Sequence, residues 1–354
     1  MQFAIAYPAR PDAWKDLVIA EDHGFTHAWF YDSQMIYSDV YACMALAAEH
    51  TKTIKLATGV AIPSNRIAPV TAHSIATINL LAPGRTILGI STGFTGRNTM
   101  GLPPVPLNVM RDYVQMCRAL LRGEEVLYRE GARERPIKFL HQHHGYINLK
   151  DPIPIYLAAN GPKALELTGE VADGWITTLC DPASLKKNLS VVEKGAAKAK
   201  RSAQDLPVVM LSASCVLRPG EPATSPRVME RIGPFAVVAL HALWERSAVA
   251  SDLPPRLQQL YDRYNTEYVA KMKTPADRRY LEVHEGHLIY LKPGEERYVD
   301  ETLIRGFSLT GSGEEIIARL KALEATGLKQ IAIQVVNNGP EMIEEFSREV
   351  IAKY

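Results

Sequence analysis

The sequence predicts an α/β protein with the (β/α)8-barrel, or TIM-barrel, fold, and two observations support this prediction. Short apolar runs alternate with helical patterns almost from one end of the 354-residue chain to the other. These runs are continuously apolar, which is typical of parallel strands that are buried on both faces. We count eight such strands, and eight βα units fit a closed barrel better than an open doubly wound sheet.

The predicted elements follow one another in a regular order. Strands are expected at residues 3–7, 28–31, 54–60, 86–90, 155–158, 175–177, 208–216 and 331–336. Helices are expected between them, among others at residues 11–23, 40–48, 70–81 and 162–171. Near the C-terminus, Ser312 and Glu315 have the spacing of a capping box, and Gly327 is placed to end the helix that they begin.

Two stretches interrupt this order. Residues 125–150 are rich in arginine and histidine and are expected to form a small excursion after the fourth helix. Residues 217–306 are rich in Pro, Arg, Tyr and His and show no regular alternation. Because a barrel needs only about 250 residues, we expect a single barrel domain over residues 1–354, with residues 217–306 inserted as a lid or side subdomain.

Composition and charge narrow the class of partner. With 40 basic and 39 acidic residues the net charge is +1, which gives no electrostatic reason to expect nucleic acid or an anionic membrane as partner. The four cysteines form no C-x-x-C pair, which argues against a disulfide framework or a thiolate zinc site. No signal peptide is recognisable, and the longest apolar stretch is too short to span a bilayer. We therefore expect a cytoplasmic protein that acts on a small molecule.

The most informative local motif is Asn160, Gly161, Pro162 and Lys163, which leaves a predicted strand and begins a helix. Pro162 stands near the first helical position, where its missing N–H costs nothing. Free backbone N–H groups, the positive end of the helix dipole and the Lys163 ammonium converge there, as an anion site requires. Two interpretations remain open at this point, a phosphate-binding turn and an ordinary capped turn.

Other candidates carry less information. Residues 91–96 follow the fourth strand, but they match neither a dinucleotide-binding glycine motif nor a P-loop. Asp32 ends the second strand, where it would act either in catalysis or as a cap on the next helix. His141, His143 and His144 suggest a metal, but no H-E-x-x-H motif or suitably spaced carboxylate accompanies them. We predict no metal site and a solvated loop instead.

Six short motifs occur along the chain in a characteristic order, at residues 56–60, 69–72, 81–85, 159–167, 172–175 and 310–315. In this order and spacing they resemble the bacterial luciferase-like superfamily of barrel oxidoreductases. The likeness is greatest to its coenzyme F420-dependent branch, which includes methylenetetrahydromethanopterin reductase. The resemblance covers nearly the whole chain and is more specific to the superfamily than to one cofactor.

The resemblance implies a barrel with insertion segments over its C-terminal mouth, where FMN or the deazaflavin F420 binds and hydride or electrons pass at the ring. By position, Gly59 and Val60 match the bulge of the third strand that supports the tricyclic ring, often through a non-prolyl cis peptide. The turn at residues 160–163 matches the segment that holds the cofactor's phosphate.

The resemblance also places residues at the tips of two other strands. Asp32 and Ser33 match the tip of the second strand near the ring, and Thr92 and Gly93 match the tip of the fourth. Two positions depart from the family pattern. Phe94 stands where several F420 enzymes carry an acidic residue, and Ser33 where some carry histidine. These departures leave the identity of the proton donor open.

We therefore expect an oxidoreductase that transfers a hydride between coenzyme F420 and a small organic substrate, with Asp32 as the catalytic residue and a dimer or tetramer as the assembly. The expected cofactor-binding residues are Ser33, Gly59, Val60, Thr92, Gly93, Asn160, Gly161, Pro162 and Lys163. Two alternatives remain, an FMN-dependent monooxygenase that uses O2 and a non-catalytic barrel that binds a ligand or cofactor.

Overall fold

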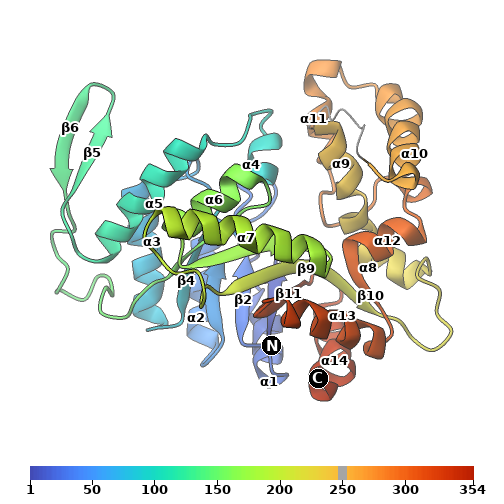
Figure 1. Cartoon of the computed structure of the whole chain (residues 1–354), viewed down its shortest axis with the longest axis horizontal. Coiled ribbons are helices and arrows are strands. Elements are labelled where there is room, and N and C mark those ends of the chain that lie inside the picture. The colour runs from blue at the N-terminus through green and yellow to red at the C-terminus, as the bar shows by residue number, and fades with distance from the viewer. Residues whose placement is uncertain (246–252) are drawn as a thin grey trace.

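Eight parallel strands close into a barrel in the computed structural model, which describes residues 1–245 and 253–354 (Figure 1). In order around the barrel they are β1 (Gln2–Tyr7), β2 (His27–Phe30), β3 (Lys55–Thr58), β4 (Thr86–Ile90), β7 (Ile155–Ala158), β8 (Gly174–Thr178), β9 (Val208–Val216) and β11 (Gln330–Gln334). Strand β9 pairs with both β8 and β11, and β11 pairs with β1, which closes the ring. The predicted (β/α)8 fold and its eight strands are confirmed.

Helices connect the strands and cover the outside of the barrel. They are α1 (Trp14–Asp22), α2 (Val40–His50), α3 (Ala68–Leu81), α4 (Phe94–Asn98), α5 (Leu107–Leu121), α6 (Pro162–Val171), α7 (Pro182–Lys198), α13 (Gly313–Ala325) and α14 (Gly339–Glu349), with a short 3-10 turn at Ile351–Lys353. The predicted capping box is present at the start of α13, where Ser312 accepts from the Glu315 N–H and Glu315 accepts from the Ser312 N–H. Local capping chemistry therefore sets this helix boundary as the sequence indicates.

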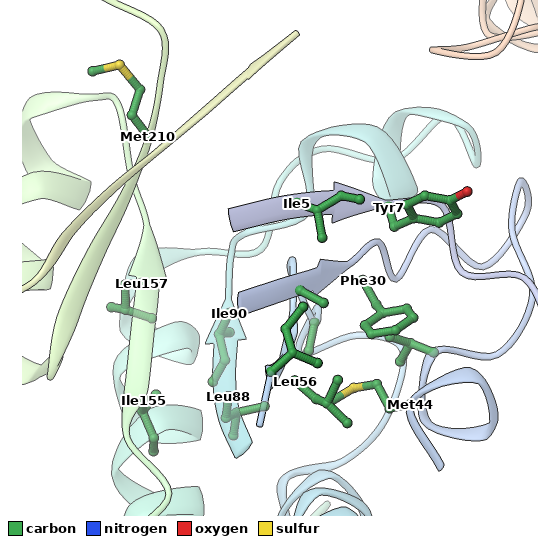
Figure 2. Packing of buried hydrophobic residues seen from close by; sticks show 14 of the residues in the cluster. Ile5, Tyr7, Phe30, Met44, Leu56, Leu88, Ile90, Ile155, Leu157 and Met210 are labelled. Carbon is green, nitrogen blue, oxygen red and sulfur yellow. The ribbon is translucent and has the colours of Figure 1, made fainter. Parts of the chain in front are cut away.

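The main apolar core lies between the strands and the surrounding helices. Figure 2 shows part of it, with Phe30 of β2 and Leu56 of β3 near Met44 of α2; Ile5 of β1 and Ile90 of β4 belong to the same cluster. Alternate residues of the same strands point into the barrel, where a second cluster forms around Trp29. This inner cluster contains several alanines, and the Trp29 indole N–H donates to the Gln330 side chain at 2.8 Å. The period of two along each strand thus separates an outer from an inner core.

Two strand-forming segments were not predicted from the sequence. Residues 125–150 begin with an antiparallel hairpin, β5 (Val126–Glu130) and β6 (Arg133–Ile137), which projects away from the barrel (Figure 1). Strand β10 (Ser308–Gly311) pairs with the C-terminal half of β9, next to the closed ring. Its four residues include only one large apolar side chain, so apolar periodicity gave no signal for it.

The inserted residues between β9 and β10 form a group of helices beside the barrel (Figure 1). They comprise α8 (Pro226–Ala236), α9 (Val238–Glu245), α10 (Pro255–Arg263), a π-helical turn (Tyr264–Tyr268), α11 (Arg279–Val283), α12 (Glu301–Phe307) and 3-10 turns at Val269–Lys271, Ala276–Arg278 and Glu295–Tyr298. This group has an apolar core of its own, which includes Ile232, Leu240 and Tyr264. Its action as a lid stays a prediction.

Candidate active site

The predicted site residues all follow barrel strands. Because the strands are parallel, their carboxyl ends lie at one rim of the barrel, which is where this fold places its active sites. The residues come after four strands that are neighbours in the ring, namely β2 (Asp32, Ser33), β3 (Gly59, Val60), β4 (Thr92, Gly93) and β7 (Asn160, Gly161, Pro162, Lys163). The fold therefore gathers the predicted residues along one arc of the rim.

The chain makes a bulge directly after β3. The Gly59–Val60 peptide bond is cis, as the resemblance implies. A Cβ atom at Gly59 would lie 2.8 Å from the Trp29 Cβ, so only glycine fits against this neighbour. The Gly59 N–H donates to the Phe30 carbonyl at 2.5 Å, which fastens the bulge to β2. Both Gly59 and Val60 are partly exposed, so the bulge is accessible at the mouth of the barrel.

The turn after β7 presents an open helix N-terminus. Gly161 is the N-cap of α6, and no side chain caps this helix. A Cβ atom at Gly161 would meet nothing within 4 Å, and Lys163 is exposed beside it. The Asn160 side-chain oxygen accepts from the Thr177 hydroxyl at 3.0 Å, which ties the turn to β8. The arrangement favours the anion-binding interpretation over an ordinary capped turn, because the free N–H groups remain available.

Asp32 is buried, with 4% of its surface exposed, and pairs with Arg66 at 2.8 Å. It does not cap the following helix, because Asp39 does so by accepting from the N–H groups of Tyr41 and Ala42. Burial raises the pKa of Asp32, and the Arg66 guanidinium opposes this shift. Of the two interpretations that the sequence left open, helix capping is wrong. The sequence also gave no signal for Arg66.

A segment of the insertion lies across the mouth of the barrel. We call residues 284–291 the strap. Its attachments come from three points of the rim: the Tyr37 hydroxyl donates to the His287 carbonyl at 3.3 Å, Thr95 Oγ1 lies 3.2 Å from His287 Nε2, and Asn337 Nδ2 donates to the Ile289 carbonyl at 3.0 Å. His287 is 2% exposed. No local pattern in the sequence predicts this contact between distant segments.

Leu288 of the strap packs against the cluster inside the barrel. The same cluster includes Trp29, Tyr31 and the partly buried Val60 of the bulge after β3. Leu288 has a φ of 63°, in the left-handed region that bulky residues rarely adopt. Strained residues of this kind occur preferentially at ligand clamps and switches. The strap and the predicted ring support are therefore linked through one apolar cluster.

A pocket of about 790 Å³ opens between α8 and the strap. This volume lies in the usual range for small-molecule sites. It is mostly apolar, and two carboxylates and one amide line it. The lining residues are Thr224, Pro226, Met229, Glu230, Pro234, Ile289, Tyr290, Leu291, Glu296, Val299 and Asn337. Since Asn337 comes after β11 and the strap forms one wall, the pocket adjoins the rim.

The three clustered histidines lie away from this rim. His141, His143 and His144 are exposed, and they come between α5 and the beginning of β7, on the side where the strands start. The rings of His141 and His144 are 5.4 Å apart. Within residues 1–245 and 253–354, no group of three or more His, Cys, Asp or Glu side chains is arranged to hold a metal ion. In the same residues no helix combines the length and apolarity that crossing a membrane requires.

The chain aligns with several known proteins, among them the following three. A 5,10-methylenetetrahydromethanopterin reductase of Methanopyrus kandleri is 26% identical over 351 residues, which cover 95% of this chain and 93% of that protein. An F420-dependent glucose-6-phosphate dehydrogenase of Nakamurella multipartita is 29% identical over 349 residues, which cover 90% and 95%. The methylenetetrahydromethanopterin reductase of Methanolobus tindarius is 32% identical over 197 residues, which cover 54% of this chain and 57% of that protein.

The fold has a counterpart among solved structures. The coenzyme F420-dependent tetrahydromethanopterin reductase from Methanopyrus kandleri superposes with a TM-score of 0.71 at 22% identity, covering 100% of this chain and 99% of that one. The family model described as "Luciferase-like monooxygenase" matches residues 8–330. The resemblance inferred from the sequence and the predicted enzyme class, a luciferase-like oxidoreductase, are confirmed. This chain belongs to the luciferase-like monooxygenase family.

Proposed function

We propose that this protein is an oxidoreductase that transfers a hydride between coenzyme F420 and a small organic substrate at the carboxyl-end rim of its barrel. One observation carries the proposal. The accessible bulge at Gly59–Val60 and the uncapped N-terminus of α6 lie on the same rim. A cofactor that carries both a ring and a phosphate needs one binding place for each of them. The name of one relative that aligns along nearly the whole chain, the F420-dependent glucose-6-phosphate dehydrogenase, supports F420 as that molecule.

The residues present fit the ring. Gly59 allows the backbone to lie close to Trp29, and a side chain at this position would have to displace that contact. Val60 and Leu288 supply apolar surface at the mouth. When bound, the deazaflavin ring supplies the atom that exchanges the hydride. The protein's own part is to orient the ring on the bulge and to exclude water through the strap.

The residues also fit a phosphate. The first N–H groups of α6 lack side-chain partners, and the positive end of the helix dipole favours an anion there. The exposed Lys163 adds a mobile ammonium, and Asn160, held by Thr177, fixes the backbone that approaches the ligand. Ser33, Thr92 and Gly93 complete the arc of the rim as further cofactor contacts. We expect the substrate in the space that the insertion covers and a dimer or tetramer in solution.

Binding of the two candidate cofactors to the purified protein tests the proposal. F420 and FMN are titrated in parallel, and binding is followed by the absorbance and fluorescence of each ring. We expect F420 to bind with a dissociation constant at least about ten-fold lower than that of FMN, a difference of roughly 1.4 kcal/mol. Tighter binding of FMN would contradict the proposed cofactor, and binding of neither would contradict the proposed function.

Asp32 stays our candidate for a catalytic role, and its ion pair with Arg66 offers an alternative role as a support of the rim. The Asp32→Asn variant separates the two. A catalytic role predicts a roughly hundred-fold slower hydride transfer, whereas a supporting role predicts an unchanged single-turnover rate. In both cases the loss of the buried ion pair with Arg66 lowers the melting temperature, so the rate decides between them. Asp39→Asn is the matched control, because Asp39 also pairs with Arg66 but lies at the start of α2.

An FMN-dependent monooxygenase that uses O2 is the second candidate. The description of the matching family model favours it, because that description names a monooxygenase. Both candidates place a tricyclic ring on the same bulge, so they differ in which ring the protein selects. The parallel titration decides between them, and oxygen consumption by the FMN-loaded protein in the presence of a chemical reductant would support the monooxygenase.

A further inference from the structure

A row of polar side chains, with two buried histidines between partly buried ends, leads from the mouth of the barrel into the insertion. It begins at Thr95, which follows β4 and whose hydroxyl lies 3.2 Å from His287 Nε2. The His287 and His284 rings follow, with centroids 5.5 Å apart. His284 Nε2 lies 2.6 Å from the carboxylate of Glu245. Both histidines are at most 5% exposed, whereas the Glu245 side chain is 15% exposed, so the row runs from the buried mouth towards solvent.

A third buried histidine, His241, adjoins the row but contacts a different carboxylate. The His241 ring lies 6.3 Å from that of His284, and its Nε2 lies 3.1 Å from Glu295. The Glu295 carboxylate, 1% exposed, also accepts from the Tyr264 hydroxyl and from the backbone N–H of Lys292, and pairs with the Lys292 ammonium. The Glu295 carboxylate is therefore surrounded by hydrogen-bond and ion-pair partners and is shielded from solvent. Glu245 is the carboxylate of this group that solvent reaches.

The inner nitrogens of these rings have an unusual environment. The Nδ1 atoms of His241, His284 and His287 are buried and have no hydrogen-bond partner within the described residues. Buried polar atoms without partners are rare, because an unsatisfied buried donor or acceptor keeps the full cost of losing its contact with water. A water molecule that bridges the Nδ1 atoms of His284 and His287 would satisfy both and would join the two rings into one hydrogen-bonded row.

We propose that Thr95, His287, His284 and Glu245 form a proton route between the mouth of the barrel and solvent. The proposal rests on the proposed function, since a hydride transfer that oxidises an alcohol or amine releases one proton besides the hydride. The hydride takes two electrons and one proton to the cofactor. The second proton, from the O–H or N–H of the substrate, has to leave a mouth that the strap covers.

The transfer balances without any further reactant. His287 Nε2 receives the proton through the Thr95 hydroxyl, and His287 Nδ1 releases its own to the bridging water. The water passes one to His284 Nδ1, and His284 Nε2 releases its proton to Glu245, which exchanges it with solvent. In the reductive direction every step is reversed. Each imidazole therefore carries one proton before and after the transfer, on the opposite nitrogen.

The charge state of the route suits this role. Burial holds the pKa of His287 well below its usual value, and the neighbouring His284, His241 and Lys292 act in the same direction. His287 is therefore neutral near pH 7, with one nitrogen as donor and the other as acceptor, as a relay requires. Among the described residues, Glu245 is the carboxylate that contacts the row itself. Glu245 therefore marks the outer end of the route, where protons exchange with solvent.

Histidine NMR tests the route without any substrate. The chain has ten histidines, so ¹⁵N-histidine labelling gives few imidazole resonances, which His284→Gln and His287→Gln assign. Glu245→Gln changes the acceptor at the outer end. We expect it to shift the ¹⁵N resonances of both His284 and His287. Glu285→Gln is the matched control, because Glu285 is exposed and adjacent to His284 and lies outside the row, and we expect it to leave His287 unchanged.

A second arm uses F420 as the probe and reports on the inner end. When F420 binds to the parent protein, as absorbance shows, we expect the His287 resonances to shift. The route is overturned if Glu245→Gln moves His284 alone, or if F420 binds and the His287 resonances stay in place. If F420 does not bind at all, the proposed function fails, and the Glu245→Gln arm still decides whether the two histidines are joined.

Discussion

The insertion meets the barrel at two places that are held by different chemistry. At its base, Arg227 and Arg231 of α8 pair with Glu345 of α14 at 3.1 and 2.7 Å, and the Arg231 side chain is 1% exposed. At its tip, the strap meets the rim through the three uncharged polar contacts around His287 and Asn337 and through Leu288. Separating a buried ion pair is costly, whereas single neutral hydrogen bonds exchange readily with water.

This difference indicates how the insertion can work. A base held by buried charges stays attached while ligands come and go. A tip held by neutral contacts can leave the mouth and return within the reaction cycle, as lids of other enzymes do. The four predictions below test this division, beginning with the largest expected effect.

Breaking an ion pair at the base of the insertion should reduce the stability of the protein most. Arg231→Ala removes the buried partner of Glu345, and separating such a pair typically costs about 3–5 kcal/mol. We expect the free energy of unfolding, measured with urea, to fall by about 3 kcal/mol or more. Arg218→Ala is the control, because Arg218 pairs with Glu341 of the same helix but its side chain is 57% exposed, so the expected loss is below about 1 kcal/mol. Equal losses of unfolding free energy in both variants would contradict the special contribution of the buried ion pair at the base of the insertion.

The second prediction asks whether the cofactor is held by the barrel and not by the insertion. Lys163→Ala removes one charge-assisted contact at the start of α6, worth about 1.5–3 kcal/mol. We expect the dissociation constant of F420 to rise roughly ten-fold or more in a fluorescence titration. Lys194→Ala, at the far end of α7, is the matched control and should leave it unchanged. An unaltered constant in Lys163→Ala would place the phosphate elsewhere.

The third prediction concerns the pH dependence of the contact between Glu221 and Arg227 at the base of the insertion. Hydrogen bonds from Arg227 lower the pKa of Glu221 to about 2, against burial, which raises it. Since the folded pKa lies below the unfolded value of about 4.3, Glu221 stabilises the fold above that value, and the contribution is lost as pH falls towards 2. Glu221→Gln should therefore destabilise the protein by about 1–2 kcal/mol at pH 7. In unfolding experiments near pH 3 this difference should shrink, and a constant difference would contradict the assignment.

The smallest effect on stability is expected at the tip. Leu288→Gly removes apolar contacts at the mouth but relieves the left-handed conformation, which costs a bulky residue about 1–2 kcal/mol. We expect the free energy of unfolding to change by less than about 1 kcal/mol, while amide exchange across residues 284–291 becomes faster. In the parent protein F420 should slow exchange in the strap and leave residues 226–236 unaffected. Equal, ligand-independent protection of both segments would show a static cover.

The sequence by itself determined most of the barrel. The strands of the closed ring are predominantly apolar runs, and the start of α13 is defined by the capping box of Ser312 and Glu315, which are three residues apart. The turn at residues 160–163 combines a strand end, Gly161 and Pro162 within four positions, so the start of a helix there could be expected. These features follow from local chemistry and from periodicity over a few residues, which a sequence displays directly.

Tertiary structure decided what depends on contacts between distant residues. The sequence left Asp32 as either a catalytic residue or a cap of α2, and only the folded chain shows that Asp39 caps this helix while Asp32 pairs with Arg66. The contact of His287 with Thr95 joins positions 192 residues apart. No local pattern encodes such a pair, because its energy depends on where the fold brings both side chains together. For the same reason the strap, the route through His284 and the attachment of the insertion became visible only in three dimensions.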